Sequence, residues 1–250
     1  MQAFLTLVRR ELGTFFFSMT GYVIIAAAAF LMGLSFVVLL VRLSTEPLPM
    51  PLTEMFYLTP FFWIVLLLAA PVITMRLFAL EKYSGTFETL MTTPVNDMQV
   101  VLAKFTAAIF FYMVMWLPLL AFLFILRHYC SGAAGMDTGG VGATFLGIFL
   151  LGCLFISLGC FASALSRSQM VSAIVSLAAG FALFLLSFLS DRVPVLPAWI
   201  NEVLAHFALF DQMHDFARGV VDSRPMIVYL TLTFFFLFLT LRAVESRRWR

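Results

Sequence analysis

The chain has 250 residues, of which 63% are hydrophobic and 11% are charged, and its formal net charge is only +2. A soluble fold of this length could not cover so much apolar surface with so few charged side chains, so the composition excludes that class. With a mean hydropathy of +1.05, the chain is expected in a lipid bilayer.

Six apolar runs are each long enough to cross the ~30 Å hydrocarbon core, which takes roughly 20 helical residues. Strands of a membrane β-barrel would be about 10 residues long with alternating polarity, whereas these runs are longer and apolar on every side. We therefore expect an all-α integral membrane protein with six transmembrane helices. The predicted spans are 21–42, 59–79, 101–126, 143–165, 170–190 and 225–243.

Residues 2–17 precede the first span and predict an amphipathic helix in the headgroup region, followed by a bend at 18–21. A cytoplasmic extension of the first span is the alternative. The apolar run is too long for the core of a cleavable signal, and no small-residue cleavage pattern comes after it. The apolar residues at helical spacing are Phe4, Val8, Leu12 and Phe15.

The distribution of basic residues predicts the orientation of the chain. An even number of spans places both termini on one side, together with the 80–100 loop and the 165–169 turn. That side holds ten of the 15 basic residues but only five of the 13 acidic ones. Because Lys and Arg accumulate on the cytoplasmic side, both termini are predicted to be cytoplasmic.

Several residues inside the spans predict shape and packing rather than chemistry. Pro71 and Pro118 lie within the second and third spans and predict kinks. Cys153 and Cys160 share one helix face with other small residues, which favours close helix packing. The three cysteines cannot form a closed disulfide framework and have no metal-ligand spacing.

The segment 191–224 is the largest region predicted on the external side. Its short helices are expected to lie against the outer leaflet and to cover the bundle. Asp211, His214 and Asp215 lie at i, i+3 and i+4, a spacing that could bind a metal. No fourth ligand is near in sequence, so solvated side chains are the favoured interpretation.

The sequence also lacks the residues that would drive transport or catalysis from within the chain. No ionisable residue falls in the middle of a predicted span, which disfavours ion-coupled transport and intramembrane catalysis. The phosphate-binding pattern G-x-x-x-x-G-K-[ST] is absent, so the chain is not expected to be an enzyme. Energy for any active process must then enter from another polypeptide.

Residues 81–97, EKYSGTFETLMTTPVND, form the one substantial loop on the predicted cytoplasmic side. Its apolar residues recur at helical spacing and predict a short surface helix between the second and third spans. Gly85 is expected to loosen the middle of this helix, Thr86 to cap the turn after it, and Pro94 to end it. An ordinary interfacial connector is the alternative.

The run RLFALEKYSGTFETLMTTPV (76–95) resembles the R-L-F-A-x-E-x-x-x-G-T-x-E-x-L-x-T-x-P-V pattern of type-2 ABC exporter permeases, in particular their gliding-motility-type branch. The stretch 211–250, with its E-S-R-R-W ending, is similar to the end of the same branch, and the N-terminal amphipathic helix fits its start. The resemblance covers the whole chain with consistent spacing.

The resemblance implies a six-span half-transporter in which Gly85 to Pro94 form the coupling helix that docks into a soluble ABC ATPase subunit. Glu81 and Glu88 would then be polar contacts with the ATPase. The residues expected to contribute to this contact are Glu81, Lys82, Gly85, Thr86, Phe87, Glu88, Leu90, Met91 and Pro94.

The resemblance also implies the partners and the location of the chain. A second permease subunit, identical or different, completes the membrane part, and an extracytoplasmic auxiliary subunit often accompanies it. ATP and magnesium would bind to the ATPase, so no cofactor is expected in this chain. The expected location is the bacterial inner membrane, with lipid and no nucleic acid as surroundings.

The predicted function is to couple ATP hydrolysis by a separate subunit to the export of a substrate that the sequence does not identify. One alternative is a non-transporting membrane module that transmits force to an external partner or serves as a scaffold. A weaker alternative is an intramembrane enzyme.

Overall fold

The computed structural model describes residues 2–45, 52–85, 96–129, 138–192 and 207–246, and these residues form helices joined by short turns. This architecture confirms the predicted all-α membrane fold. In chain order the helices are α1 (Gln2–Phe16), α2 (Met19–Thr45), α3 (Leu52–Tyr57), α4 (Pro60–Thr74), α5 (Ala79–Ser84), α7 (Asp97–Met115), α8 (Leu117–Tyr129), α9 (Thr138–Leu165), α10 (Gln169–Arg192), α12 (Leu209–Ala217) and α13 (Ser223–Glu245).

Within the described part of the chain, six helical stretches are long and apolar enough to cross a membrane, and each overlaps one predicted span. The second stretch combines α4 and α5, and the third combines α7 and α8. The six stretches are Met19–Arg42, Pro60–Ser84, Asp97–Ile125, Gly139–Leu165, Gln169–Ser187 and Ser223–Glu245.

The third stretch is interrupted where the sequence predicts a kink. α7 ends at Met115 and α8 begins at Leu117, one residue before Pro118. Proline has no backbone N–H to donate, and its ring clashes with the preceding turn, so a regular helix cannot continue through it unchanged. The backbone bridges the break with short-range hydrogen bonds, from Trp116 N to Met113 O and from Leu119 N to Trp116 O, both 3.1 Å long.

Helix α9 is the most buried of the six stretches and forms the centre of the bundle. It contacts α13, α10, α4, α12 and α7. Its glycines allow the close contacts: a Cβ atom on Gly159 would lie 2.2 Å from Thr74 Oγ1, and one on Gly152 would lie 2.3 Å from Tyr112 Cε1. Cys153 and Cys160 are buried in this helix as free thiols. Small residues therefore let α9 pack closely against its neighbours, as expected for helices in lipid.

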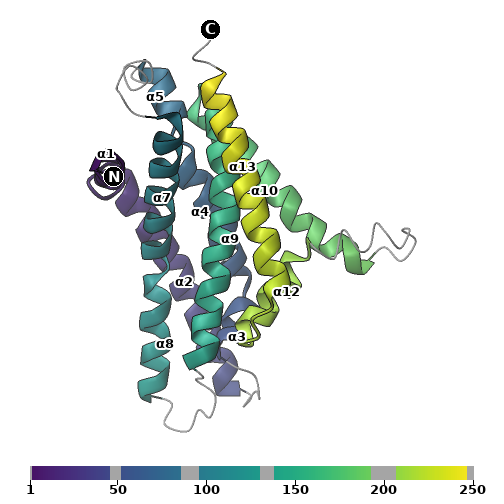
Figure 1. The fold of residues 1–250 in the computed structure, drawn as a ribbon. Coiled ribbons are helices and arrows are strands. Elements are labelled where there is room, and N and C mark those ends of the chain that lie inside the picture. The colour runs from purple at the N-terminus through teal and green to yellow at the C-terminus, as the bar shows by residue number, and fades with distance from the viewer. Residues whose placement is uncertain (1, 46–51, 86–95, 130–137, 193–206, 247–250) are drawn as a thin grey trace.

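Helix α1 lies across one end of the bundle, beside the upper part of α7 (Figure 1). The turn after α1 brings Gly21 so close to the preceding helix that a Cβ atom there would lie 2.0 Å from Phe15 O. Ser18 Oγ accepts a hydrogen bond from Gly21 N at 3.1 Å. The bend expected at 18–21 is thus present and requires glycine.

Both ends of the described chain reach the same end of the bundle in Figure 1. We call the end that carries α1, α5 and the C-terminus of α13 the terminal end, and the end that carries α3 and α12 the opposite end.

Helix α12, part of the predicted external segment, packs against α9, α10 and α3. It buries Leu209, Met213, Phe216 and Ala217, and Thr53 Oγ1 of α3 donates to Ala217 O at 2.7 Å. The apolar face of α12 is therefore covered by protein, which agrees with the expectation that this helix covers the bundle, while its contact with the outer leaflet stays a prediction. Residues 193–206, the other part of that segment, lie outside the described residues.

Candidate functional site

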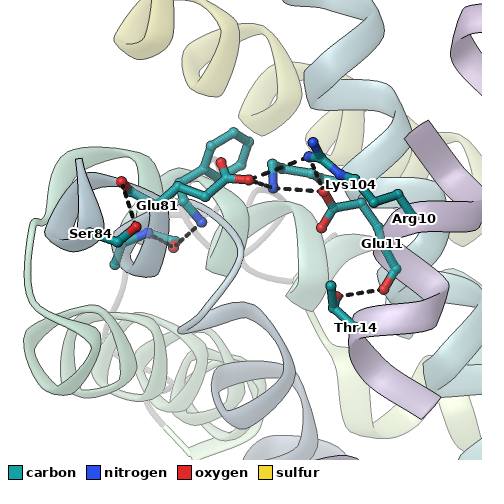
Figure 2. A network of polar contacts seen from close by, with 9 residues as sticks. Arg10, Glu11, Thr14, Glu81, Ser84 and Lys104 are labelled. Carbon is teal, nitrogen blue, oxygen red and sulfur yellow. Dashed lines mark hydrogen bonds and ion pairs between the residues drawn. The ribbon is translucent and has the colours of Figure 1, made fainter. Parts of the chain in front are cut away.

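A buried lysine occupies the junction of three helices at the terminal end. Lys104 belongs to the second turn of α7, and its side chain is only 2% exposed. Its Nζ atom lies 2.8 Å from Glu81 Oε1 on α5 and 3.1 Å from Glu11 Oε1 on α1. Figure 2 shows these side chains pointing toward one another from the three elements. Lys104 therefore joins α1, α5 and α7 directly.

Arg10 completes this group, which we call the terminal cluster (Arg10, Glu11, Glu81 and Lys104). One Arg10 nitrogen lies 2.8 Å from Glu11 Oε1 and 3.5 Å from Glu81 Oε1, at the rim of the cluster (Figure 2). The cluster holds two cations and two carboxylates, so their formal charges cancel. A buried charge is very unfavourable unless it is paired and hydrogen-bonded. The mutual pairing explains how Lys104 and Glu11 can both be buried.

Helix periodicity brings α1 and α7 into this arrangement. Glu11 and Phe15 are four residues apart on one face of α1, and Lys104 and Phe111 are seven apart on one face of α7. The Phe15 and Phe111 rings stack with centroids 4.9 Å apart. One aromatic contact and one ion pair thus hold the same two faces together, and the aromatic contact fixes the register of the ion pair.

Helix α5 is attached to the end of α9 by three hydrogen bonds. Ser163 Oγ of α9 accepts hydrogen bonds from the backbone N–H groups of Phe78 and Ala79, each 3.1 Å long. These N–H groups begin the helix and have no partner within it. Lys82 Nζ donates to Ala164 O, close to the end of α9. Together with Glu81 in the terminal cluster, these contacts fix α5 to both α7 and α9.

Gly85 ends α5, at the position where the sequence predicts that it loosens the segment. Its φ of +74° lies in the left-handed region, which glycine adopts at no steric cost. A glycine in this conformation commonly terminates a helix. The weak point that the sequence predicts at Gly85 is thus the end of α5, and residues 86–95, where the predicted helix continues, lie outside the described residues.

The other predicted contacts of the coupling segment, Thr86, Phe87, Glu88, Leu90, Met91 and Pro94, lie outside the described residues. Glu81 and Lys82 are described, and both contact other helices of this chain, a role that the sequence did not predict. Glu11, Arg10 and Lys104 were missed as site residues. The signal that could have found them was Lys104 itself, because a cation inside a predicted span needs a partner of opposite charge.

A second group of charged residues lies at the opposite end, and we call it the opposite cluster (Glu54, His214 and Arg218). Glu54 of α3 is 3% exposed, and its Oε1 atom lies 2.7 Å from His214 Nε2 and 3.0 Å from Arg218 Nη2. Burial alone would raise the pKa of Glu54, but hydrogen bonds and charges from Arg218 and His214 outweigh it and lower that pKa. The cluster holds α12 on α3.

The opposite cluster also bears on the metal hypothesis for Asp211, His214 and Asp215. His214 is hydrogen-bonded to Glu54 and stacks on the Tyr57 ring with centroids 5.8 Å apart. Among the residues that the structure describes, no group of three or more His, Cys, Asp or Glu side chains is placed to hold a metal ion. His214 is a structural contact between two short helices.

The fold and these charged junctions define a multi-pass α-helical membrane protein. Residues 41–243 match the sequence model described as ABC-2 family transporter protein. Because this match covers most of the chain, the protein belongs to the ABC-2 family. Membership makes it the membrane component, or permease subunit, of an ABC transporter, which associates with an ABC ATPase and is generally not itself catalytic. The comparison with curated proteins gave no match.

Proposed function

We propose that the protein is the permease subunit of an ATP-driven exporter in the bacterial inner membrane, of the gliding-motility-type branch. The terminal end faces the cytoplasm, and residues 81–97 contact the ATPase, which binds ATP and magnesium. A second permease subunit completes the membrane part. An extracytoplasmic auxiliary subunit, where present, meets the opposite end at α3 and α12.

The observation that carries this proposal is the attachment of α5, the described start of the predicted coupling segment. α5 follows α4 after a four-residue turn, bonds α7 through Glu81, and bonds α9 through Lys82 and Ser163. A displacement of residues 81–97 by the ATPase would therefore pull on several membrane helices at once. A connector that merely joined two spans would not require these contacts.

The charge of the terminal end supports the orientation. Ten basic and five acidic residues belong to the segments assigned to that side, against five and eight on the other. Excess Lys and Arg in short loops is the usual mark of the cytoplasmic side. The ATPase, a cytoplasmic subunit, would then meet this end of the bundle.

The test is reconstitution of the permease with its ATPase in proteoliposomes, with Glu88→Arg as the central variant. Reversing this charge in the predicted docking helix should abolish co-purification of the ATPase and the ATP turnover of the complex. Glu245→Arg is the matched control, because Glu245 lies at the end of α13 on the same terminal end and pairs only with the exposed Arg242 among described residues. Unchanged association and turnover in both Glu88→Arg and a deletion of residues 84–92 would refute the proposed contact.

A further inference from the structure

A pocket of about 270 Å³ lies beside the terminal cluster, between α1, the start of α2, the end of α4, α5 and α7. Its volume is near the lower limit of the roughly 300–1,000 Å³ typical of small-molecule sites. The half-exposed Arg10 and the exposed Thr20 lie on its lining, so it is open to the surface. The pocket is large enough for a headgroup, and not for a whole lipid.

The positive and negative formal charges on the pocket lining are not equal in number. Three cations, Arg10, Arg76 and Lys104, face two carboxylates, Glu11 and Glu81. Both carboxylates are already paired with Arg10 and Lys104. The lining therefore carries one net positive charge, and that charge belongs to Arg76.

Arg76 is held in place by neutral groups. Its Nη1 atom donates to Thr20 Oγ1 at the start of α2, and its Nε atom donates to Gln169 Oε1 at the start of α10, at 3.5 Å. No carboxylate of the described residues lies within ion-pair distance of it. A guanidinium has five N–H donors in a planar fork that suits the oxygens of a phosphate group. Arg76 is thus positioned by its neighbours while its charge is left uncompensated.

Part of the remaining wall is apolar and belongs to the membrane helices. Ile24 lies on α2, further into the span than Thr20. Val72 and Ile73 lie on the last turn of α4, further into the span than Arg76. The pocket therefore has a polar part at the level of the amphipathic α1 and an apolar part that continues toward the hydrocarbon. A phospholipid at the interface has the same two parts in the same order.

We propose that this pocket binds the phosphodiester headgroup of an anionic phospholipid. Arg76 pairs with the phosphate, and the start of an acyl chain lies along Ile24 and Val72. The single net charge of the lining favours a lipid with one negative charge over a zwitterionic one. This site goes beyond the proposed transport function, because it requires only that the protein resides in a membrane and not that residues 81–97 contact an ATPase.

The test is native mass spectrometry of the full chain released from detergent, with phosphatidylglycerol, phosphatidylcholine and inorganic phosphate as probes. The wild type should retain phosphatidylglycerol in preference to phosphatidylcholine. Arg76→Gln should lower phosphatidylglycerol retention about tenfold, as expected for the loss of a charge-assisted contact. Arg242→Gln is the matched control, because it removes an exposed arginine from the same end, and should retain the lipid like the wild type.

Three outcomes would overturn the proposal. The first is equal retention of phosphatidylglycerol by Arg76→Gln and the wild type, and the second is equal retention of the two lipids by the wild type. The third is displacement of phosphatidylglycerol by equimolar inorganic phosphate, which would identify a site for free anions. Should Arg76→Gln fail to purify as a single species, Ile24→Trp fills the apolar part without changing charge and should reduce retention. A photoactivatable phosphatidylglycerol should label residues 20–24 or 72–80 of the wild type, whereas label confined to the outer faces of α10 and α13 would refute the site.

Discussion

Each end of the bundle has a cluster of charged side chains arranged around a buried one, but the two clusters differ in sign and in the elements they join. At the terminal end, the cation Lys104 of a membrane-spanning helix lies between two carboxylates that come from α1 and α5. At the opposite end, the carboxylate Glu54 lies between His214 of α12 and Arg218, the half-exposed residue directly after that helix. The terminal cluster links three helices (α1, α5 and α7), whereas the opposite cluster links only α12 to α3.

This difference indicates two roles. A contact that joins α5 to α1 and α7 can transmit a displacement of the predicted coupling segment into the bundle. A contact between α3 and α12, neither of which is among the six spanning stretches, holds these two short helices together at the opposite end. If so, breaking the terminal cluster should affect both stability and coupling, and breaking the opposite cluster should affect stability alone.

The largest effect is expected from Lys104→Met. It leaves the buried carboxylate of Glu11 and the partly buried carboxylate of Glu81 with only Arg10 to compensate them, and removing one partner of a buried ion pair costs about 3–5 kcal/mol. The measurement is the denaturation midpoint of the full chain in detergent, with Arg242→Met as the control for an exposed pair, which contributes about 1 kcal/mol or less.

A triple variant distinguishes the effect of Lys104→Met on stability, through unbalanced charge, from its effect on coupling. The triple variant Lys104→Met, Glu11→Gln, Glu81→Gln removes all the buried charges and should recover most of the lost stability, because uncharged replacements leave no uncompensated ion. ATP turnover of the reconstituted complex should nevertheless be uncoupled from transport. A triple variant that is as coupled as the wild type would show that the terminal cluster serves stability only.

An intermediate effect is expected from Glu54→Gln at the opposite end. The amide keeps the shape of the side chain but loses the charge-assisted hydrogen bonds to His214 and Arg218, which are typically worth about 1–3 kcal/mol. The loss is smaller than for Lys104 because Arg218 can turn to solvent. The denaturation midpoint should fall while the ratio of transport to ATP turnover stays unchanged, and a fall in that ratio would abolish the contrast between the two ends.

A pH titration sharpens the contrast further. The pKa of Glu54 is lowered in the folded protein, so its ionised form stabilises the fold above the unfolded pKa near 4.5, and this contribution is lost as the pH falls below that value. The difference in denaturation midpoint between the wild type and Glu54→Gln should therefore shrink from about pH 6 to about pH 4. A difference that stays constant over this range would contradict the assignment of the stabilisation to the Glu54 charge.

The sequence predicted the helices well because apolar length is a local property of the chain. It could not predict the terminal cluster, since Glu11 and Lys104 are 93 residues apart and meet only because α1 folds back onto α7. It could not say what covers the apolar face of α12, because an amphipathic helix has the same pattern whether lipid or protein covers it. For Gly85 it predicted a weak point but not the end of α5, because a glycine at helical spacing can either loosen a helix or end it.

The smallest effect is expected from Ser163→Ala, which tests whether α5 must be attached to α9 as well as to the terminal cluster. Loss of the hydroxyl leaves the N–H groups of Phe78 and Ala79 without their acceptor, and a lost helix cap typically costs about 1 kcal/mol. Ser166→Ala is the matched control, since Ser166 lies just after α9 and its hydroxyl bonds only the nearby Ala162 O in the described structure. If α5 transmits displacement, Ser163→Ala should lower the ratio of transport to ATP turnover more than its small stability loss would suggest. Equal ratios of transport to ATP turnover in the two serine variants would show that the Ser163 contact is not needed for transmission.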